Sequence, residues 1–213
     1  MRKNANLLLM CIILCTWIGT LLTLSMPRLM VQNKNEDVEV LSDTIQEFEM
    51  VSKLDSIKNA LIEEVETYVY GRYTKTHKTI PLTIVEKGLE NEVDIMFIMA
   101  QTQIETSFGT AGVGRETSRR SLFGVANKSY NSYEHAIDDY VRILRKYYLT
   151  NGRTEHHLMN KYTTGSGARY AENPNYEVEL KGAYHNIKKK TKISELQSRY
   201  QELYLEESKT KML

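Results

Sequence analysis

The chain has very little cysteine, because only Cys11 and Cys15 carry thiols among its 213 residues. Both lie inside an apolar run near the N-terminus, so everything after Pro27 can hold neither a disulfide nor a cysteine-ligated metal. Leu14, directly before Cys15, makes a lipoprotein cleavage signal a poor interpretation. Histidines do not replace the cysteines as ligands, since the spacing of the five matches no metal-binding pattern: His77, His135, His156, His157 and His185. We therefore expect no metal and no cofactor.

A nucleotide-binding loop is also missing. Three glycines crowd residues 109–114, which superficially resembles a phosphate-binding loop. Such a loop should follow a strand and end in Lys and then Ser or Thr, whereas this stretch follows a predicted helix and lacks that ending. The glycines more simply let the backbone turn tightly.

The sequence has almost no net charge, +1 at pH 7, which argues against broad electrostatic adhesion to nucleic acid. The charges are nevertheless unevenly placed: acidic residues dominate residues 36–66, and four lysines lie within residues 188–192. We interpret both clusters as solvated helix faces. No nucleic-acid partner is expected.

One long apolar run is present, at residues 7–24. It is long enough to cross a bilayer core, which needs about 20 apolar residues, whereas the apolar core of a cleavable signal peptide has about 7 to 15. We predict an uncleaved transmembrane signal anchor in residues 1–27, with residues 7–26 in the membrane and with Arg2 and Lys3 on the cytoplasmic side. The remainder of the chain would then lie outside the cytoplasm. A cleaved signal peptide is the alternative.

Residues 28–80 are predicted to form a helical stalk and a linker. Across residues 41–68, apolar side chains recur in steps of three or four, which is the spacing of one long amphipathic helix. This helix could hold the next domain off the membrane, form the first helix of that domain, or mediate self-association as an irregular coiled coil. The polar stretch at residues 71–81 is interpreted as the linker.

The rest of the sequence predicts helices and almost no strands, since alternation with a period of two is nearly absent. We expect a mainly α fold, with at most a small hairpin between Ser121 and Tyr133. One domain is assigned to residues 81–190, and a C-terminal amphipathic helix and tail to residues 191–213. Helices are predicted, with approximate limits, at residues 82–88, 94–108, 132–151, 155–162, 173–187 and 193–203.

Two of these helices have specific start signals. Ser132 is a suitable N-cap, because its hydroxyl can accept a backbone N–H of the first turn. Asn173 followed by Pro174 predicts another start, with proline at the first helical position.

One predicted helix carries an unusual carboxylate. Residues from Asp94 onward form an apolar face, and Gly109 supplies a stop, so Glu105 falls in the last turn. Burial on such a helix disfavours the charged form of a carboxyl group and raises its pKa, which suits a general acid near neutral pH. Taken alone, a glutamate near a helix end is more often solvated or ion-paired. Its sequence surroundings decide between the two interpretations.

Four blocks of sequence, in order, resemble the bacterial and phage glucosaminidases, a family of glycoside hydrolases that cut peptidoglycan. Residues 100–110 give an Ala-x-x-x-x-Glu-Thr-x-Phe-Gly-Thr pattern, and residues 121–125 read Ser-Leu-Phe-Gly-Val. Residues 130–140 resemble the block that ends in Asp-Tyr, and residues 170–180 contain Tyr-Ala-x-x-Pro-x-Tyr. The match spans roughly residues 81–187.

The resemblance implies a lysozyme-like catalytic domain with a cleft between lobes, which hydrolyses the glycan next to N-acetylglucosamine. Glu105 matches the general acid of the family. Tyr170 matches a tyrosine of the sugar-binding cleft, and its hydroxyl could orient the substrate's acetamido group or an attacking water.

Four further residues are substrate-binding candidates by the same resemblance. Phe123 and Gly124 would line the floor of the cleft, where Phe123 could equally be a core residue. Phe108 and Tyr176 complete the set, although packing is the main role expected of Tyr176.

The sequence departs from the family pattern in its second lobe, which is reduced. Family members commonly have a longer β-containing segment after the Leu-Phe-Gly block, and this segment often contributes a second carboxylate. Here only residues 125–129 separate that block from the next, and none of them is acidic. Glu116 and Glu134 are the candidates for a second carboxylate, with solvation or helix capping as their simpler roles. We hypothesise that the 2-acetamido group of the substrate, or a water positioned by Tyr170, completes the reaction.

Three functions fit the sequence. The first is a membrane-anchored glucosaminidase acting on peptidoglycan glycan strands, in wall remodelling or phage lysis. The second is a muramidase or lytic transglycosylase acting on the same glycan. The third is a non-catalytic wall-binding or structural protein of an envelope or virion, with a degenerate lysozyme-like fold. We expect a membrane-anchored protein whose catalytic domain lies outside the cytoplasm, in the periplasm or at the cell surface, with a phage virion or lysis component as the alternative.

Overall fold

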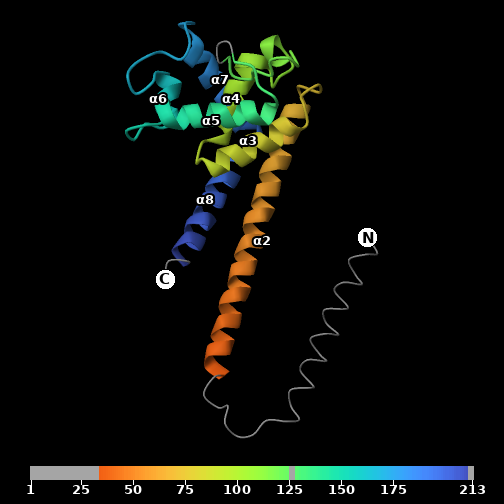
Figure 1. The fold of residues 1–213 in the computed structure, drawn as a ribbon, viewed down its shortest axis with the longest axis vertical. Helices are drawn as coiled ribbons and strands as arrows, with labels where there is room; N and C mark the ends of the chain where they lie inside the picture. The colour runs from red at the N-terminus through yellow and green to blue at the C-terminus, as the bar shows by residue number, and fades with distance from the viewer. Residues whose placement is uncertain (1–33, 125–127, 211–213) are drawn as a thin grey trace. The chain divides into compact units, whose positions relative to one another are not determined.

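The computed structural model describes residues 34–124 and 128–210, and this part of the chain is mainly helical, as predicted, with no strand in it. Contacts divide the chain into two units, Met1–Glu49 and Met50–Leu213. Its elements, shown in Figure 1, are the α-helices α2 Lys34–Tyr70, α3 Thr79–Glu90, α4 Ile95–Thr106, α5 Tyr133–Ile143, α6 Glu155–Asn160, α7 Tyr176–Lys190 and α8 Ile193–Thr210, the 3₁₀ turn η1 Gly112–Gly114 and the π-helical turn η2 Leu144–Tyr148.

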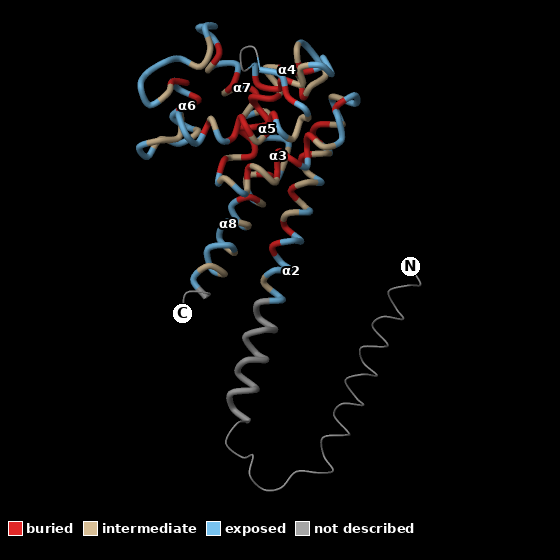
Figure 2. The backbone as a smooth tube through the Cα atoms, in the orientation of Figure 1, coloured by how far each residue is buried: buried red, intermediate tan, exposed pale blue. Residues whose placement is uncertain are grey.

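Helix α4 is the centre of the second unit. It packs against α3, α7 and α8, and all of its residues from Ile95 to Thr102 are buried. Figure 2 shows the buried residues gathered where these helices meet. The Asp94 side chain caps its N-terminus by accepting the backbone N–H of Met96 at 2.8 Å. Residues 95–100 are all apolar and cover every side of the helix, so this part of α4 fits only inside a core.

The end of α4 follows from the residues after it. Ser107 and Phe108 both adopt left-handed backbone conformations, with φ of 50° and 55°, before Gly109 at 78°. The Phe108 N–H bonds back to the Thr102 carbonyl at 3.2 Å, so the helix stops at Thr106. The predicted end of this helix is confirmed, although the left-handed turn that ends it starts at Ser107, two residues before Gly109.

The C-terminal part of α2 belongs to the same core as α4. Its side chains Leu61, Val65 and Val69 are fully buried in the cluster that also contains the α4 residues. The predicted long helix is therefore present, and residues 50–70 of the predicted stalk lie in the second unit. Self-association through this helix stays a prediction.

The predicted membrane segment, residues 7–26, lies outside the described residues together with Cys11 and Cys15. Within the residues that the structure does describe, none of the helices is both long and apolar enough to cross a bilayer.

Two helix starts differ from the predictions. Helix α3 begins at Thr79, before Pro81, because a proline in the first turn lacks only an N–H that the helix leaves unpaired anyway. Helix α7 begins at Tyr176, after the Asn173-Pro174 pair. The Asn173 side chain instead accepts the Asn175 N–H at 2.9 Å, which makes this pair a turn.

Helix α5 begins at its predicted cap, since the Ser132 hydroxyl accepts the His135 N–H at 3.1 Å. Its α-helical part ends at Ile143 and continues as the π-helical turn η2, which sequence periodicity did not reveal. No strand of the predicted hairpin is present in the described part of residues 121–133, and an isolated antiparallel bridge joins Thr163 to Arg169 instead.

Candidate active site

Glu105 lies in the last turn of α4, and its side chain is half-buried. Burial raises its pKa above the usual glutamate value, while the hydroxyl groups of Tyr176 and Tyr170 work to lower it. No cation takes part in this balance, so the carboxyl group is not part of an ion pair among the described residues. Such an environment favours a group that can hold a proton near neutral pH.

Gly124 brings the Leu-Phe-Gly block directly against this carboxyl group. A Cβ atom built on Gly124 would lie 2.6 Å from Glu105 Oε2, which leaves no room for a side chain. Gly124 has a φ of 61° and is itself exposed. The space in front of Oε2 therefore exists because residue 124 is a glycine.

Thr106 holds the two sequence blocks together. Its buried hydroxyl donates to the Leu122 carbonyl at 3.1 Å and accepts the Gly109 N–H at 3.2 Å. These two hydrogen bonds join Thr106 and Gly109 of the first sequence block to Leu122 of the Leu-Phe-Gly block, and together they form one corner. This corner fixes Gly124 in front of Glu105.

Tyr176 is the residue that contacts Glu105 most directly. Its hydroxyl donates to Oε1 of Glu105 at 2.6 Å, and its ring is almost fully buried. Burial and the nearby carboxylate both raise the Tyr176 pKa, so the hydroxyl keeps its proton and acts as a donor. The prediction that Tyr176 mainly packs was incomplete, because only the fold shows that its hydroxyl contacts Glu105.

Tyr170 lies beside the same carboxylate but directs its hydroxyl elsewhere. That hydroxyl donates to the Phe123 carbonyl at 2.5 Å. The ring stacks on Tyr162 with a centroid distance of 4.4 Å, and Tyr148 from the π-helical turn meets both rings edge-on. Burial, followed by the charges of Tyr162 and Glu105, raises the Tyr170 pKa well above the usual tyrosine value. The predicted catalytic pair is thus brought together inside a cluster of tyrosines.

The two predicted phenylalanine contacts are core residues. Phe108 is fully buried and packs on Tyr73, with ring centroids 5.2 Å apart. Phe123 is 1% exposed and stacks on Tyr140 at 3.8 Å. Neither ring has free surface for a sugar, so their contribution is to hold the backbone of the site in place, through the Phe123 carbonyl in particular.

The structure does not pair Glu105 with either predicted second carboxylate. Glu116 is exposed, and its backbone carbonyl closes a turn with the N–H of Arg119 at 2.9 Å. Glu134 lies in the first turn of α5; burial acts to raise its pKa, but hydrogen bonds from its own N–H and from Thr79 outweigh burial and hold the pKa below the usual value. No hydrogen bond joins either carboxylate to Glu105 in the described part of the chain. Both fit solvated or capping roles.

Two other carboxyl groups with raised pKa values lie at the opposite end of α4. Burial raises the pKa of Asp94 and of Glu155, and the Asp94 N–H donates to Glu155 at 3.1 Å. Asp94 is eleven residues before Glu105, a rise of roughly 16 Å along a helix. Because two-carboxylate glycosidases keep these groups about 5 to 9.5 Å apart, Asp94 does not serve as the partner.

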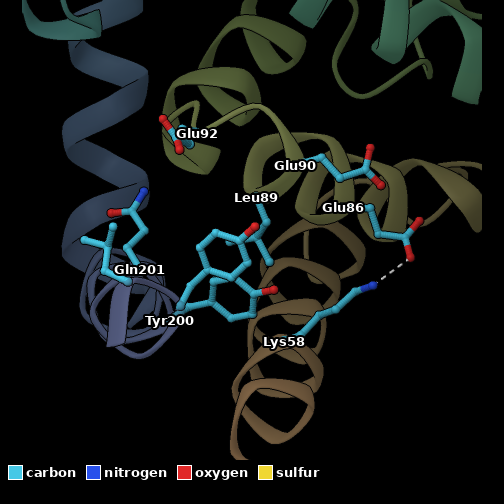
Figure 3. A pocket seen from close by; sticks show the side chains of 9 residues that line it. Lys58, Glu86, Leu89, Glu90, Glu92, Tyr200 and Gln201 are labelled. Carbon is cyan, nitrogen blue, oxygen red and sulfur yellow. Dashed lines mark hydrogen bonds and ion pairs between the residues drawn. The ribbon is translucent and has the colours of Figure 1, made fainter. Parts of the chain in front are cut away.

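A separate hollow of about 560 Å³ lies between α2, α3 and α8. Figure 3 shows Leu89 and Tyr200 pointing into it, with the ion pair between Lys58 and Glu86 (3.0 Å) at its edge. Glu105 is not one of its lining residues. The hydrogen bonds of Glu105 and the space that Gly124 leaves in front of it locate the site better than this hollow does. No group of three or more His, Cys, Asp or Glu in the described residues could hold a metal.

Sequence reasoning missed the residues behind the site. Gln101, one helical turn before Glu105, is fully buried, and its Oε1 accepts the hydroxyl protons of Tyr140 and Tyr162. A glutamine directly after the apolar residues 95–100, four residues before the candidate acid, is the signal that could have found it.

Comparison with known proteins gives one match to this region. The family model named Glucosaminidase, described as mannosyl-glycoprotein endo-beta-N-acetylglucosaminidase, matches residues 83–189, about half of the chain. No individual curated protein shows significant similarity to the chain. The matched residues run from α3 into α7 and include Glu105, Gly124, Tyr170 and Tyr176.

Proposed function

Because the chain belongs to the glucosaminidase family of glycoside hydrolases, we propose that it cleaves peptidoglycan glycan strands next to N-acetylglucosamine, with Glu105 as general acid. The family resemblance of the four sequence blocks is confirmed by the match. One observation carries the assignment of the acid. Glu105 is a half-buried carboxyl group that has no cation partner among the residues described, and it faces a space that Gly124 leaves open.

The two oxygens of Glu105 have different tasks in this proposal. Oε1 is occupied by the Tyr176 hydroxyl, so the acidic proton is carried on Oε2. The position that a side chain at residue 124 would fill lies 2.6 Å from Oε2. This is hydrogen-bonding distance, so the leaving glycosidic oxygen can occupy that position and take the proton.

The second half of the reaction needs a group that stabilises the developing positive charge at the sugar C1. Among the described residues, the causes that shift the Glu105 pKa are burial and two tyrosine hydroxyls and include no carboxylate, which favours a substrate-assisted route. The C1–O bond breaks as the Glu105 proton passes to the leaving oxygen, and the carbonyl oxygen of the 2-acetamido group bonds to C1. Water then attacks C1, the bond to the acetamido oxygen breaks, and the water proton returns to Glu105.

The lysozyme-like arrangement with a reduced second lobe is part of the same proposal. A short second lobe removes the segment that would supply another carboxylate, which makes the acetamido group the more important partner. Tyr170 lies next to Glu105, and its proposed role is to orient that acetamido group or the attacking water.

Activity of the full chain on purified peptidoglycan tests the proposal. We expect fragments with N-acetylglucosamine at the reducing end by mass spectrometry, and near-complete loss of activity in Glu105→Gln. Glu116→Gln and Glu134→Gln are the matched controls and should stay active. Full activity in Glu105→Gln would remove the general-acid assignment, and muramic acid or anhydro ends would identify a muramidase or a lytic transglycosylase. Binding without cleavage would identify a non-catalytic protein.

The full chain is needed because a fragment starting at Pro81 would lack α2. Leu61, Val65 and Val69 of that helix are fully buried in the core, so its removal would expose apolar surface of α4 and its neighbours.

We also propose that the enzyme acts outside the cytoplasm, anchored by residues 7–26. This rests on the apolar run in the sequence. Membranes that contain the full chain should retain it after an alkaline carbonate wash, whereas a variant without residues 7–26 should be released. Release of both proteins would count against the anchor.

A further inference from the structure

Gln101 has a buried amide donor without a partner. Its side-chain oxygen accepts two hydroxyl protons, from Tyr140 and from Tyr162 at 2.8 Å. Its Nε2 makes no hydrogen bond within the described part of the chain, although no solvent reaches it. Buried amide donors are rarely left unpaired, because the loss of their bonds to water is costly. An unpaired donor one turn from Glu105, on the same helix face, therefore indicates a partner that is engaged during function.

The Tyr170 hydroxyl is the group beside this donor. The Gln101 amide lies close enough to oppose the burial-driven rise of the Tyr170 pKa, although no hydrogen bond of normal geometry joins the two groups. The Tyr170 proton points to the Phe123 carbonyl, so the lone pairs of its oxygen remain available to a donor. Stacking of Tyr170 on Tyr162, which itself bonds to Gln101, keeps the two side chains adjacent.

Tyr170 has one proton and two acceptors nearby, the Phe123 carbonyl and the Glu105 carboxylate. While Glu105 is protonated, the carbonyl is the better acceptor. Once Glu105 has given its proton to the leaving group, its carboxylate is the stronger acceptor, because charge-assisted hydrogen bonds are roughly twice as strong.

We propose that Gln101 is a positioning residue: its free amide donates to the Tyr170 oxygen and directs the Tyr170 proton to the Glu105 carboxylate as that carboxylate forms. This inference rests on the proposed role of Glu105 as the acid. The hydrogen bond from the Gln101 amide to the Tyr170 oxygen also polarises the Tyr170 hydroxyl and makes it a better donor. Gln101 thus acts on the reaction through Tyr170, without touching the substrate.

The full chain carrying Gln101→Met tests this role, because methionine has a similar length and no amide. Loss of the donor weakens the Tyr170 bond to the carboxylate, so we expect the Glu105 pKa to rise. The basic limb of the kcat/KM profile should then move to higher pH, and kcat should fall about tenfold, the effect of one charge-assisted hydrogen bond. Thr102→Val is the matched control: it removes another buried polar group of α4, a hydroxyl that donates to the Ile98 carbonyl, and should leave the limb in place.

Two results separate this inference from the proposed function. If Glu105→Gln is inactive while Gln101→Met keeps the wild-type basic limb, Gln101 has no positioning role, whatever its effect on stability. If Glu105→Gln is active, the acid assignment itself fails. Should Gln101→Met not fold, the side-chain amide signals of Gln101 in ¹⁵N-labelled wild type and Tyr170→Phe decide, above the pH at which Glu105 ionises. A signal that moves on loss of the Tyr170 oxygen supports the inference, and an unchanged signal overturns it.

Discussion

Replacing Gly124 by alanine tests whether the space in front of Glu105 is the place where chemistry occurs. The added Cβ would lie 2.6 Å from Oε2, 3.3 Å from Cδ and 3.7 Å from Oε1 of Glu105. Only the first of these distances is impossibly short, so the new methyl group presses on the oxygen that we propose carries the proton.

The size of the effect follows from two separate terms. Alanine at a φ of 61° costs about 1 to 2 kcal/mol of stability, because its Cβ meets its own backbone in the left-handed region. Beyond that, Oε2 must retreat by about 0.8 Å to reach an ordinary contact of roughly 3.4 Å. A misplacement of this size costs up to about 100-fold in rate, and the methyl group also fills the position of the leaving oxygen.

Gly152→Ala is a matched control, because it shares the backbone strain of alanine at positive φ but not the contact with Glu105. Gly152 has a φ of 74°, and a Cβ built there meets no atom within 4 Å. Both variants should lose similar stability, roughly 2 to 4 °C in the unfolding midpoint per kcal/mol for a chain of this size. Only Gly124→Ala should lose about 100-fold in kcat/KM on purified peptidoglycan. Equal activity of the two variants would refute the placement of the leaving oxygen beside Gly124.

Three further outcomes are expected. Tyr176→Phe removes the donor at 2.6 Å from Oε1, so the Glu105 pKa should rise and the basic limb of kcat/KM should move to higher pH; an unmoved limb would show that this hydroxyl does not act on the acid. In the wild type, kcat/KM should fall as pH rises through the Glu105 pKa, which burial has raised, and Glu105→Gln should lack this limb. Burial acts to raise the Asp139 pKa, but contacts with Lys128, Tyr130 and Arg142 outweigh burial and hold this pKa below its value in the unfolded chain. The stability that Asp139 contributes is therefore present above the unfolded pKa and is lost as the pH falls through the folded pKa. Asp139→Asn should cost about 1 to 3 kcal/mol in urea unfolding at neutral pH and little at a pH below the folded pKa, whereas an equal loss at both would contradict this linkage.

Much of the helical structure could be predicted from local pattern. Ser132 caps α5, and the residues from Ser107 to Gly109 end α4, because caps and left-handed turns depend on a few neighbouring residues. The errors are also local in origin. The sequence predicts a boundary at Pro81, although proline fits the first turn of a helix. It also predicts a helix start at Asn173-Pro174, where the Asn173 side chain closes a turn instead.

The roles of the aromatic residues could not be predicted in the same way. Phe123 and Tyr176 both belong to sequence blocks of the family, yet one ring is buried in the core and the other ends in a hydroxyl on Glu105. Whether such a ring packs in the core or reaches Glu105 depends on its neighbours in the fold, and these come from distant parts of the sequence. Tyr176 is 71 residues from Glu105, and no periodicity relates the two.

By itself, the sequence determined the helical class, the family and the identity of the candidate acid, because these depend on spacing and on residue types that the chain states directly. The tertiary structure alone decided what surrounds that acid. It brought Gly124, Tyr170 and Tyr176 onto one carboxyl group, and it left the Gln101 amide without a partner among the residues that the structure describes. The physical reason is that burial and hydrogen bonding, which set the pKa and the open side of Glu105, are properties of packed neighbours and not of neighbours along the chain.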